Sequence, residues 1–324
     1  MKKIVGIDIG GTKVSLILAT VQGKILNSRT LKTRTGKVEA RLCVNEMVHV
    51  LQEILREARL RKGNLLGIGV GIPGPVNTER GEVPWSPNLG GWEGILLRQI
   101  LTRRFSVPVF LDNDANAAGY GEKKFGAGKN TRDFVYMTVS TGIGGGLVLG
   151  GRIHRGASFC GGEIGHIPVV PDGNRCKCGK RGCLEAYASG TAIAKMAQSQ
   201  LASGRKSRLV RMAGSVKRVT GETVTQAAFR GDKLSLEILR EAGRYLGIGL
   251  ATVMNILNPE MIVLGGGVMK AGANIWKPMI ASAKKEAWPI AFKACRVIKT
   301  KLGTHVGNLG AAALVLHGKD TDSA

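Results

Sequence analysis

Short apolar runs that end in glycine or in polar residues recur along the chain and predict β-strands. The runs at 4–9, 14–20 and 25–33 are separated by turns of only a few residues, which predicts an antiparallel meander. Later runs predict strands at 65–76, 107–114, 134–140, 147–151 and 261–268. Apolar residues at helical spacing predict helices at 38–62, 91–105, 115–126, 185–203, 222–230, 233–257, 273–287 and 307–318, and we expect the polar end, 319–324, to be disordered.

The arrangement strand–glycine turn–strand occurs twice, at 4–20 and again at 134–151. This duplication predicts an α/β protein with two halves whose turns aim at one ligand between them. A dinucleotide-binding fold is not expected, because a strand and not a helix follows the first turn. The GxGxxG spacing of that fold is also absent there.

The composition allows either one large domain or two medium domains, since 44% of the 324 residues are hydrophobic. No apolar run is long enough to span a bilayer. The start, MKKIVGIDIGG, predicts a first strand and not a signal peptide, so we expect a cytoplasmic protein with no membrane partner. In that compartment, closely spaced cysteines favour a metal site over a disulfide.

Basic residues outnumber acidic residues by 47 to 23, which gives a formal net charge of +24. The segment 203–219 carries Arg205, Lys206, Arg208, Arg211, Lys217 and Arg218 and no acidic residue. Such a surface attracts anionic ligands. However, no aromatic residue interleaves with these side chains to stack on bases, and no binding module accompanies them, so we do not expect nucleic acid as a partner.

Three glycine turns are candidates for binding phosphate groups, because glycine leaves backbone N–H groups uncovered. In IDIGGTK the threonine adds a hydroxyl and the lysine a positive charge, while Asp8 suits a hydrated Mg²⁺. A tight hairpin with a surface lysine explains the same residues, and no Walker A motif is present. Three such turns favour a nucleotide site built from Asp8, Gly10, Gly11, Thr12, Lys13, Thr141, Gly142, Gly144, Gly145, Gly146, Gly265 and Gly266.

The segment LDNDANAA places Asp112, Asn113 and Asp114 where a strand meets a helix. Asp and Asn are common helix caps, which is one interpretation of this segment. The other is that one carboxylate is a general base that takes a proton from a hydroxyl, as phosphoryl transfer requires. We favour Asp114 as the base and Asn113 as its hydrogen-bonding neighbour.

Four metal-ligating residues lie within eighteen positions: His166, Cys176, Cys178 and Cys183. A Cys₃His set is typical of tetrahedral zinc, and C-x-C is too short for the common redox motif. With all four positions filled by protein, the zinc would be structural. Cys43, Cys160 and Cys295 have no partner spacing and are interpreted as small core residues.

Two acidic residues, Glu163 and Glu185, flank the cysteine cluster. A sugar needs fixed, charged acceptors for its hydroxyl groups, because charge-assisted hydrogen bonds are strong and directional. His166 could bind zinc through one ring nitrogen and present the other to a substrate or to a supporting acceptor. Ordinary surface acids are the alternative.

Six segments together resemble the ROK sugar kinases: GIDIGGTK, GIPGPV, LDNDANAA, VSTGIGGGLVLGGRIHRGASFCGGEIGH, CKCGKRGCLE and LNPEMIVLGGG. The resemblance covers nearly the whole chain. It implies the two-lobed actin/sugar-kinase/Hsp70-like, ribonuclease H-like α/β fold with an ATP cleft between the lobes. We expect the smaller lobe to comprise 1–114 plus 307–324, and the larger lobe 115–306 with the zinc-bound loop 166–183.

The resemblance also implies an activity, the Mg²⁺-dependent transfer of the γ-phosphoryl group of ATP to a hexose hydroxyl. Carried over by position, Asp114 activates the sugar 6-hydroxyl, and the glycine turns hold the phosphates. SPNLGGW resembles the sugar loop of glucokinase-type members, which favours glucose and adds Asn88 to the site. The implied sugar-binding residues are Asn88, Asn113, Asp114, Gly142, Glu163, His166 and Glu185.

The family leaves alternatives open. Members include fructokinases, N-acetylmannosamine and N-acetylglucosamine kinases, and transcriptional repressors with a winged-helix domain ahead of the kinase-like part. We expect no such domain here, because the chain begins just before its first strand. A sugar sensor or polyanion-binding protein without catalysis is the alternative of a different class. Members are often dimers, so the resemblance allows a homodimer, but the sequence points to no interface and leaves the oligomeric state open.

Overall fold

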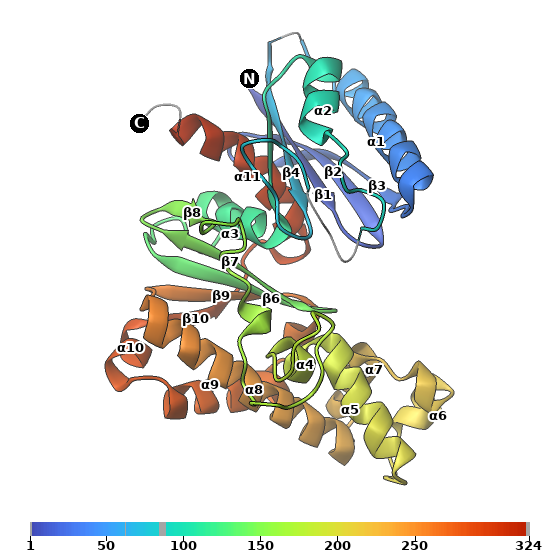
Figure 1. Ribbon diagram of the computed structural model, residues 1–324, viewed down its shortest axis with the longest axis vertical. Coiled ribbons are helices and arrows are strands. Elements are labelled where there is room, and N and C mark those ends of the chain that lie inside the picture. Colours follow the sequence, from blue (N-terminus) through green and yellow to red (C-terminus); the bar gives the residue numbers. More distant parts are fainter. Residues whose placement is uncertain (1, 62, 84–88, 322–324) are drawn as a thin grey trace. The chain divides into compact units, whose positions relative to one another are not determined.

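The three apolar runs at the start of the chain form the predicted meander. Strands β1 (Lys3–Ile9), β2 (Lys13–Thr20) and β3 (Ile25–Lys32) pair antiparallel. Strands β4 (Leu65–Ile72) and β5 (Val109–Asn113) join in parallel, which gives the sheet order β3-β2-β1-β4-β5 (Figure 1). The structure is a computed structural model that describes residues 2–61, 63–83 and 89–321.

The chain divides into two compact units. The first comprises 1–136, 146–162 and 300–324, and the second comprises 137–145 and 163–299. The first unit holds the sheet just described and four helices: α1 (Lys37–Glu57), α2 (Leu97–Phe105), α3 (Asp114–Phe125) and α11 (Val306–Thr321). The lobes expected from the sequence, 1–114 plus 307–324 and 115–306, remain a prediction.

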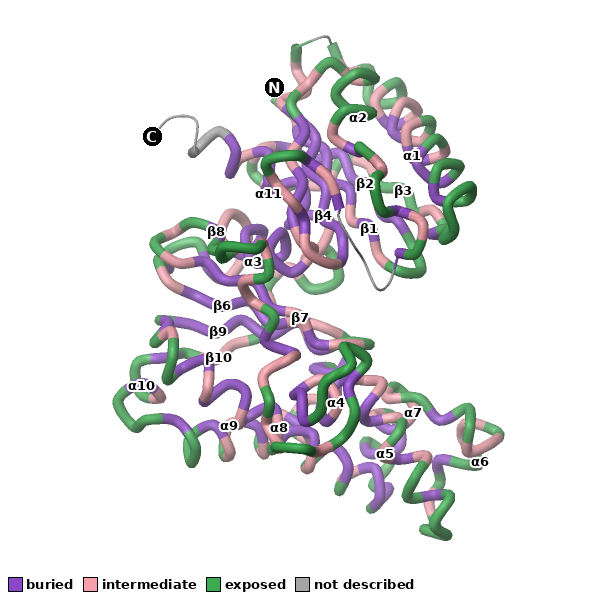
Figure 2. Tube along the Cα trace, viewed as in Figure 1, coloured by how far each residue is buried: buried purple, intermediate pink, exposed green. Residues whose placement is uncertain are grey.

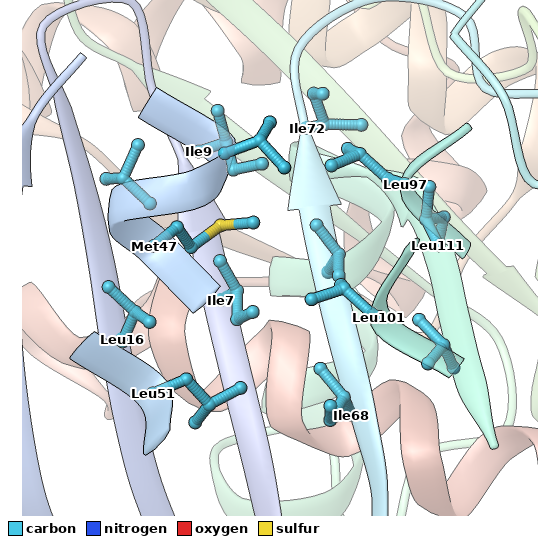
Figure 3. Packing of buried hydrophobic residues seen from close by; sticks show 14 of the residues in the cluster. Ile7, Ile9, Leu16, Met47, Leu51, Ile68, Ile72, Leu97, Leu101 and Leu111 are labelled. Carbon is cyan, nitrogen blue, oxygen red and sulfur yellow. The ribbon is translucent and has the colours of Figure 1, made fainter. Parts of the chain in front are cut away.

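The main core of the first unit lies between its sheet and the helices α1 and α2. Met47 and Leu51 of α1 and Leu101 of α2 meet Ile7 and Ile68 of the strands, and all five side chains are fully buried (Figure 3). Burial of a side chain of this size contributes about 1.5–3 kcal/mol each. The helical spacing of apolar residues in 38–62 therefore has its expected cause, a helix packed on a sheet.

The opposite face of this sheet is covered by α11, which packs directly on the strand backbones (Figure 1). A Cβ atom added to Gly69 of β4 would lie 1.8 Å from the carbonyl oxygen of Ala311, and one added to Gly6 of β1 would lie 2.3 Å from that of Asn308. Both strands therefore need glycine where the helix crosses them.

The second sheet has the order β10-β9-β6-β7-β8. Its strands are β6 (Phe134–Val139), β7 (Ile143–Leu149), β8 (Arg152–His154), β9 (Met261–Gly265) and β10 (Arg296–Lys299). β9 and β10 are parallel and β7 and β8 antiparallel, so both sheets are mixed and the fold is α/β.

The second unit is rich in helices. These are α4 (Glu185–Ala188), α5 (Gly190–Ala202), α6 (Leu209–Ala213), α7 (Gly221–Phe229), α8 (Lys233–Leu257), α9 (Ala273–Glu286) and α10 (Pro289–Ala294). α8 has a broad buried face (Figure 2), and Gly243 and Gly247 let α9 approach its backbone closely. In the described part of the chain, no helix is long and apolar enough to cross a membrane.

Some predicted elements were wrong in their extent. The helix predicted at 91–105 begins at Leu97, because Gly91 and Gly94 have positive φ angles of 90° and 74° that a helix excludes. The helix predicted at 185–203 is broken at Ser189, whose extended backbone and side-chain oxygen cap α5. Disorder was predicted from 319, but α11 continues to Thr321; residues 322–324 lie outside the described part.

We predict that Gly69→Ala lowers the free energy of unfolding by about 3 kcal/mol, the upper end of the usual cost of overpacking a core. The reason is the contact of the new methyl group with the α11 backbone. Chemical denaturation measures the change. Gly90→Ala is the matched control, because a Cβ there meets no atom within 4 Å, and an equal loss in both variants would contradict the account.

Candidate functional site

The first glycine turn joins β1 to β2 and is fixed by the residue after β3. The Gly10 N–H donates to the Lys13 carbonyl at 2.9 Å, and the Thr33 hydroxyl donates to the Gly10 carbonyl at 2.6 Å. The Thr33 N–H also donates to the Thr12 carbonyl at 3.1 Å. The turn is therefore a rigid hairpin that exposes Gly11, the hydroxyl of Thr12 and the ammonium group of Lys13.

Asp8 lies near the end of β1, against the first turn of α11. A Cβ atom on Gly307 would come within 2.2 Å of its carboxylate, so glycine is required there. Burial, together with the negative charge of Asp114, raises the pKa of Asp8 to about 6, and Lys13 acts in the opposite direction. The structure thus brings Asp8, Asp114 and Lys13 into one electrostatic neighbourhood within the first unit.

Three consecutive residues at the junction of β5 and α3 have different environments. Asp112 is buried, and the Arg155 guanidinium donates to its Oδ2 from Nε at 2.8 Å and from Nη2 at 2.6 Å. Its Oδ1 accepts from the Asn113 N–H at 2.8 Å and from the Asn116 amide at 3.0 Å. Burial raises the pKa of Asp112, while the charge of Arg155 counteracts this.

Asn113 is the N-cap of α3. Its Oδ1 accepts from the N–H groups of Ala115 and Asn116, at 2.9 and 3.2 Å, and its Nδ2 donates to the Gly74 carbonyl at 3.1 Å. The capping interpretation is therefore confirmed for Asn113. Asp114 is the first residue of the helix, partly exposed, with Oδ1 accepting from the Ala115 N–H at 2.8 Å.

Sequence reasoning missed two residues that fix α3, Arg155 at its junction with β5 and Glu122 near its other end. Arg155 neutralises Asp112, and no spacing in the sequence signals that pairing across 43 positions. Glu122, on the last turn of α3, is fully buried and accepts from the Thr300 hydroxyl and from the N–H groups of Lys301 and Leu302. Its one sequence signal is an acid in a helix of mostly small and apolar residues.

The four predicted metal ligands meet in the second unit. The ligand atoms of His166, Cys176, Cys178 and Cys183 all lie within 4.8 Å of one another. His166 Nδ1 is 3.8 Å from Cys176 Sγ, and the sulfur atoms of Cys178 and Cys183 are 3.7 Å apart. Zinc–sulfur bonds of about 2.3 Å at tetrahedral angles give ligand separations of about 3.8 Å, so the residues fit zinc.

The environment of the cluster also favours a cation. Burial and the neighbouring thiols raise the pKa of Cys183 to about 12, so a positive ion is needed to let the thiols ionise together.

The three cysteines outside the cluster were all predicted to be core residues, and two of them are. Cys43 and Cys295 are buried as expected, whereas Cys160 is exposed, so its interpretation as a core residue was wrong.

Glu163 and Glu185 both lie beside the cluster. His166 turns its Nε2 toward Glu163 Oε2, at 3.8 Å, while its Nδ1 faces Cys176. Glu185 Oε1 lies 4.0 Å from Cys176 Sγ, and its Oε2 accepts from the Ile143 N–H at 2.8 Å. Glu185 thus connects the cysteine cluster to the turn after β6.

That turn is held by three segments of the second unit. A Cβ on Gly142 would lie 2.4 Å from Glu185 Oε2, and one on Gly266 would lie 2.2 Å from the Val139 carbonyl. The Thr191 hydroxyl of α5 donates to the Thr141 carbonyl at 2.8 Å. Thr141, Gly142 and Gly266 therefore lie close together, and Gly265 ends β9 beside them.

The glycine turn predicted at 142–146 is shorter than expected. Strand β7 begins at Ile143, so Gly144, Gly145 and Gly146 lie in a strand and not in a turn. Packing requires glycine at position 146, because an added Cβ atom would lie 2.3 Å from the Ala115 carbonyl of α3. Their role in holding phosphate stays a prediction.

The predicted site residues thus fall into two sets. The first unit brings together Asp8, Gly10, Gly11, Thr12, Lys13, Asn113 and Asp114. The second unit brings together Thr141, Gly142, Glu163, His166, Glu185, Gly265, Gly266 and the three cysteines of the cluster. Asn88 lies outside the described residues.

These features define a class: a mixed-sheet α/β protein of two units with a carboxylate at a strand–helix junction and a Cys₃His cluster. The model of the ROK family matches residues 4–318. A glucokinase of Halalkalibacterium halodurans is 35% identical over 312 residues, covering 96% of this chain and 94% of that protein. The chain belongs to the ROK family.

Two further comparisons show the range of the family. The structure of a ROK glucokinase from Streptomyces griseus, in complex with glucose and AMPPNP, matches with a TM-score of 0.80 and 33% identity, covering 96% of this chain and 98% of that one. A putative xylose repressor of a Caldicellulosiruptor species is 30% identical, covering 97% of this chain and 78% of that protein. The fold is accordingly the actin-like, two-lobed fold of ROK sugar kinases.

We predict that the purified protein carries one zinc ion per chain, and that Cys178→Ser lowers this occupancy to near zero. Loss of one thiolate opens the tetrahedral set. Elemental analysis after extensive dialysis measures the ratio. Cys160→Ser is the control, because Cys160 lies outside the cluster. Zinc-free wild-type protein, or full occupancy in Cys178→Ser, would contradict the assignment.

We predict that Asp8→Asn raises the free energy of unfolding of the ligand-free protein at pH 7.5. The folded-state pKa of about 6 exceeds the ordinary 3.8, so the ionised carboxylate destabilises the fold above pH 6 by about 3 kcal/mol. Below about pH 3 the carboxyl is protonated in both the folded and the unfolded state, and the gain should disappear. Chemical denaturation at the high and the low pH measures the change in the free energy of unfolding, with the exposed Asp172→Asn as the control. If Asp8→Asn were no more stable than the wild type at pH 7.5, the prediction would be refuted.

Proposed function

We propose that this protein transfers the γ-phosphoryl group of ATP to the 6-hydroxyl of a hexose, with glucose as the favoured substrate. The observation that carries the proposal is the junction of β5 and α3, where Asp112 is paired with Arg155 and Asp114 is accessible at the start of the helix. The similarity to glucokinases along nearly the whole chain, and to a structure with glucose and AMPPNP, supports the choice of substrates.

In this proposal Asp114 is the general base that takes the proton of the 6-hydroxyl. Of the carboxylates at the junction, Asp112 cannot serve, because its two oxygens are already occupied by Arg155, Asn113 and Asn116. Asp114 is oriented by the Ala115 N–H through one oxygen, and its position at the start of the helix is fixed by the Asn113 cap. A base must be held in place before it can act, and these contacts hold it.

The sugar is assigned to Glu163, His166 and Glu185, with Asn88, Asn113 and Gly142 as further contacts. Carboxylates accept hydrogen bonds from hydroxyl groups strongly and directionally. Glu185 is fixed by the Ile143 N–H, and His166 faces Glu163 through Nε2. Structural zinc bound by His166 and the three cysteines would brace this loop, because all four of its positions are filled by protein.

The phosphate groups are assigned to the backbone N–H groups and the side chains of the glycine turns, with Thr12 and Lys13 exposed in the first. Asp8 is the residue that would hold Mg²⁺, the ion that neutralises charge on the transferring phosphates. A raised pKa near 6 still leaves Asp8 mostly ionised at neutral pH, as an ion ligand must be.

Other hexoses are the alternatives within this reaction: N-acetylmannosamine, N-acetylglucosamine and fructose. A protein that binds sugar without turnover is the alternative outside it, and the similarity to a xylose repressor keeps it a specific candidate. The accessible Asp114 favours the enzyme. We further propose a cytoplasmic homodimer that takes part in carbohydrate metabolism.

A coupled assay for ADP formation across a panel of hexoses tests the proposal. We expect Mg²⁺- and ATP-dependent turnover, with the highest kcat/KM for glucose. An amino-sugar kinase would instead favour the N-acetylated hexoses, because its pocket has room at carbon 2. Saturable sugar binding without ADP release would contradict the proposal and favour the sensor.

We predict that Asp114→Ala lowers kcat by about 10²–10⁴-fold, the usual contribution of a general base, while KM for the sugar changes less. Thermal unfolding should remain close to that of the wild type, since Asp114 is partly exposed and the Asn113 cap and the Asp112–Arg155 pair remain. Glu286→Ala, at an exposed position at the end of α9, is the control. Unchanged turnover in Asp114→Ala would remove Asp114 from the mechanism.

A further inference from the structure

A cavity of the first unit lies along the edge strand β5, between α2 and α11. Its volume is about 480 Å³. The polar side chains of its lining are Thr78, Arg98, Thr102, Asp112, Arg155 and His317. Of the residues described, neither Asp114 nor any residue of the glycine turns lines it, so it is separate from the site assigned above.

Arg98 is the unusual residue of this cavity. Its Nη1 donates to the Glu79 carbonyl at 2.8 Å and its Nη2 to the Thr78 carbonyl at 2.5 Å. Its Nε is buried and has no hydrogen-bond partner in the described part of the chain. The two carbonyl partners are neutral, and no carboxylate of the described residues forms an ion pair with this half-buried guanidinium. Burial without a counter-ion also lowers the pKa of Arg98.

The other charged residues of the cavity do not compensate Arg98. Among the described lining residues, Asp112 is the one carboxylate, and Arg155 neutralises it through two contacts. The other polar groups are the hydroxyl groups of Thr78 and Thr102 and the imidazole of His317. The cavity therefore combines a net positive charge with hydroxyl groups and with the second N–H of each Arg98 Nη.

We propose that this cavity binds a small phosphate-bearing anion, with the Arg98 guanidinium as its charged contact. Arginine is well suited to phosphate because it offers several N–H donors in a fixed plane, and each Nη of Arg98 has a second N–H besides the one that donates to a carbonyl. Free phosphate and a phosphorylated sugar share this chemistry. The cavity lies along β5, the strand that ends one residue before Asp114, and a ligand bound there lies outside the site assigned to the substrates.

Isothermal titration calorimetry at constant ionic strength tests the proposal, with inorganic phosphate and glucose 6-phosphate as separate probes. Glucose 6-phosphate is the product of the proposed reaction and can also bind the site assigned above, so the measured quantity is the binding that the two cavity variants lose. Arg98→Gln keeps a hydrogen-bonding side chain but removes the charge. Arg104→Gln, at an exposed position of the same helix, is the matched control. Thr102→Phe narrows the cavity without changing Arg98.

We expect saturable binding of at least one probe to the wild type and to Arg104→Gln. Binding at one site should weaken at least 10-fold in both Arg98→Gln and Thr102→Phe, since a charged hydrogen bond to phosphate is lost or blocked. Tighter binding of glucose 6-phosphate than of phosphate identifies a sugar phosphate as the ligand, and the reverse identifies the free ion. No saturable binding to the wild type, or equal binding to all variants with unchanged thermal unfolding, overturns the proposal.

Discussion

The buried ion pair between Asp112 and Arg155 is the interaction on which the candidate active site depends. It fixes the end of β5, where the chain must change from strand to helix within one residue. Asn113 then caps α3, and Asp114 begins it. Three adjacent polar residues thus have three roles: Asp112 pairs with Arg155, Asn113 caps the helix, and Asp114 is the base in the proposed mechanism. Such a junction holds a base rigidly, which catalysis by positioning demands.

The second unit also holds its candidate site residues in place, but through cysteines. There the cysteine cluster, and not an ion pair, organises a loop without regular structure. Glu185 reaches from the cluster to the Ile143 N–H, and glycine at 142 makes room for its carboxylate. The polar groups assigned to the sugar therefore lie next to the Cys₃His cluster, and the proposed structural zinc would fix their position.

Most of the fold could be predicted from the sequence because its elements are long and regular. Strands β1 to β3 and helix α8 follow directly from apolar spacing, and the Cys₃His set follows from the spacing of its ligands. The start of α2 could not be predicted from that spacing, because positive φ angles at Gly91 and Gly94 decide it. Short elements such as β8 and β10 carry too few residues for any period. The Asp112–Arg155 pair depends on the tertiary fold, and so does the cavity around Arg98.

The account of the junction is tested most directly by measuring kcat and the free energy of unfolding together for Asp112→Asn and Asp114→Asn. The two variants should lose different properties, stability in Asp112→Asn and turnover in Asp114→Asn. Asp112→Asn leaves Arg155 half-buried without its partner and should lose about 3–5 kcal/mol of stability, yet keep measurable turnover. Asp114→Asn should keep its stability and lose turnover. If Asp112→Asn instead abolished turnover at full stability while Asp114→Asn stayed active, the assignment of the base would be wrong.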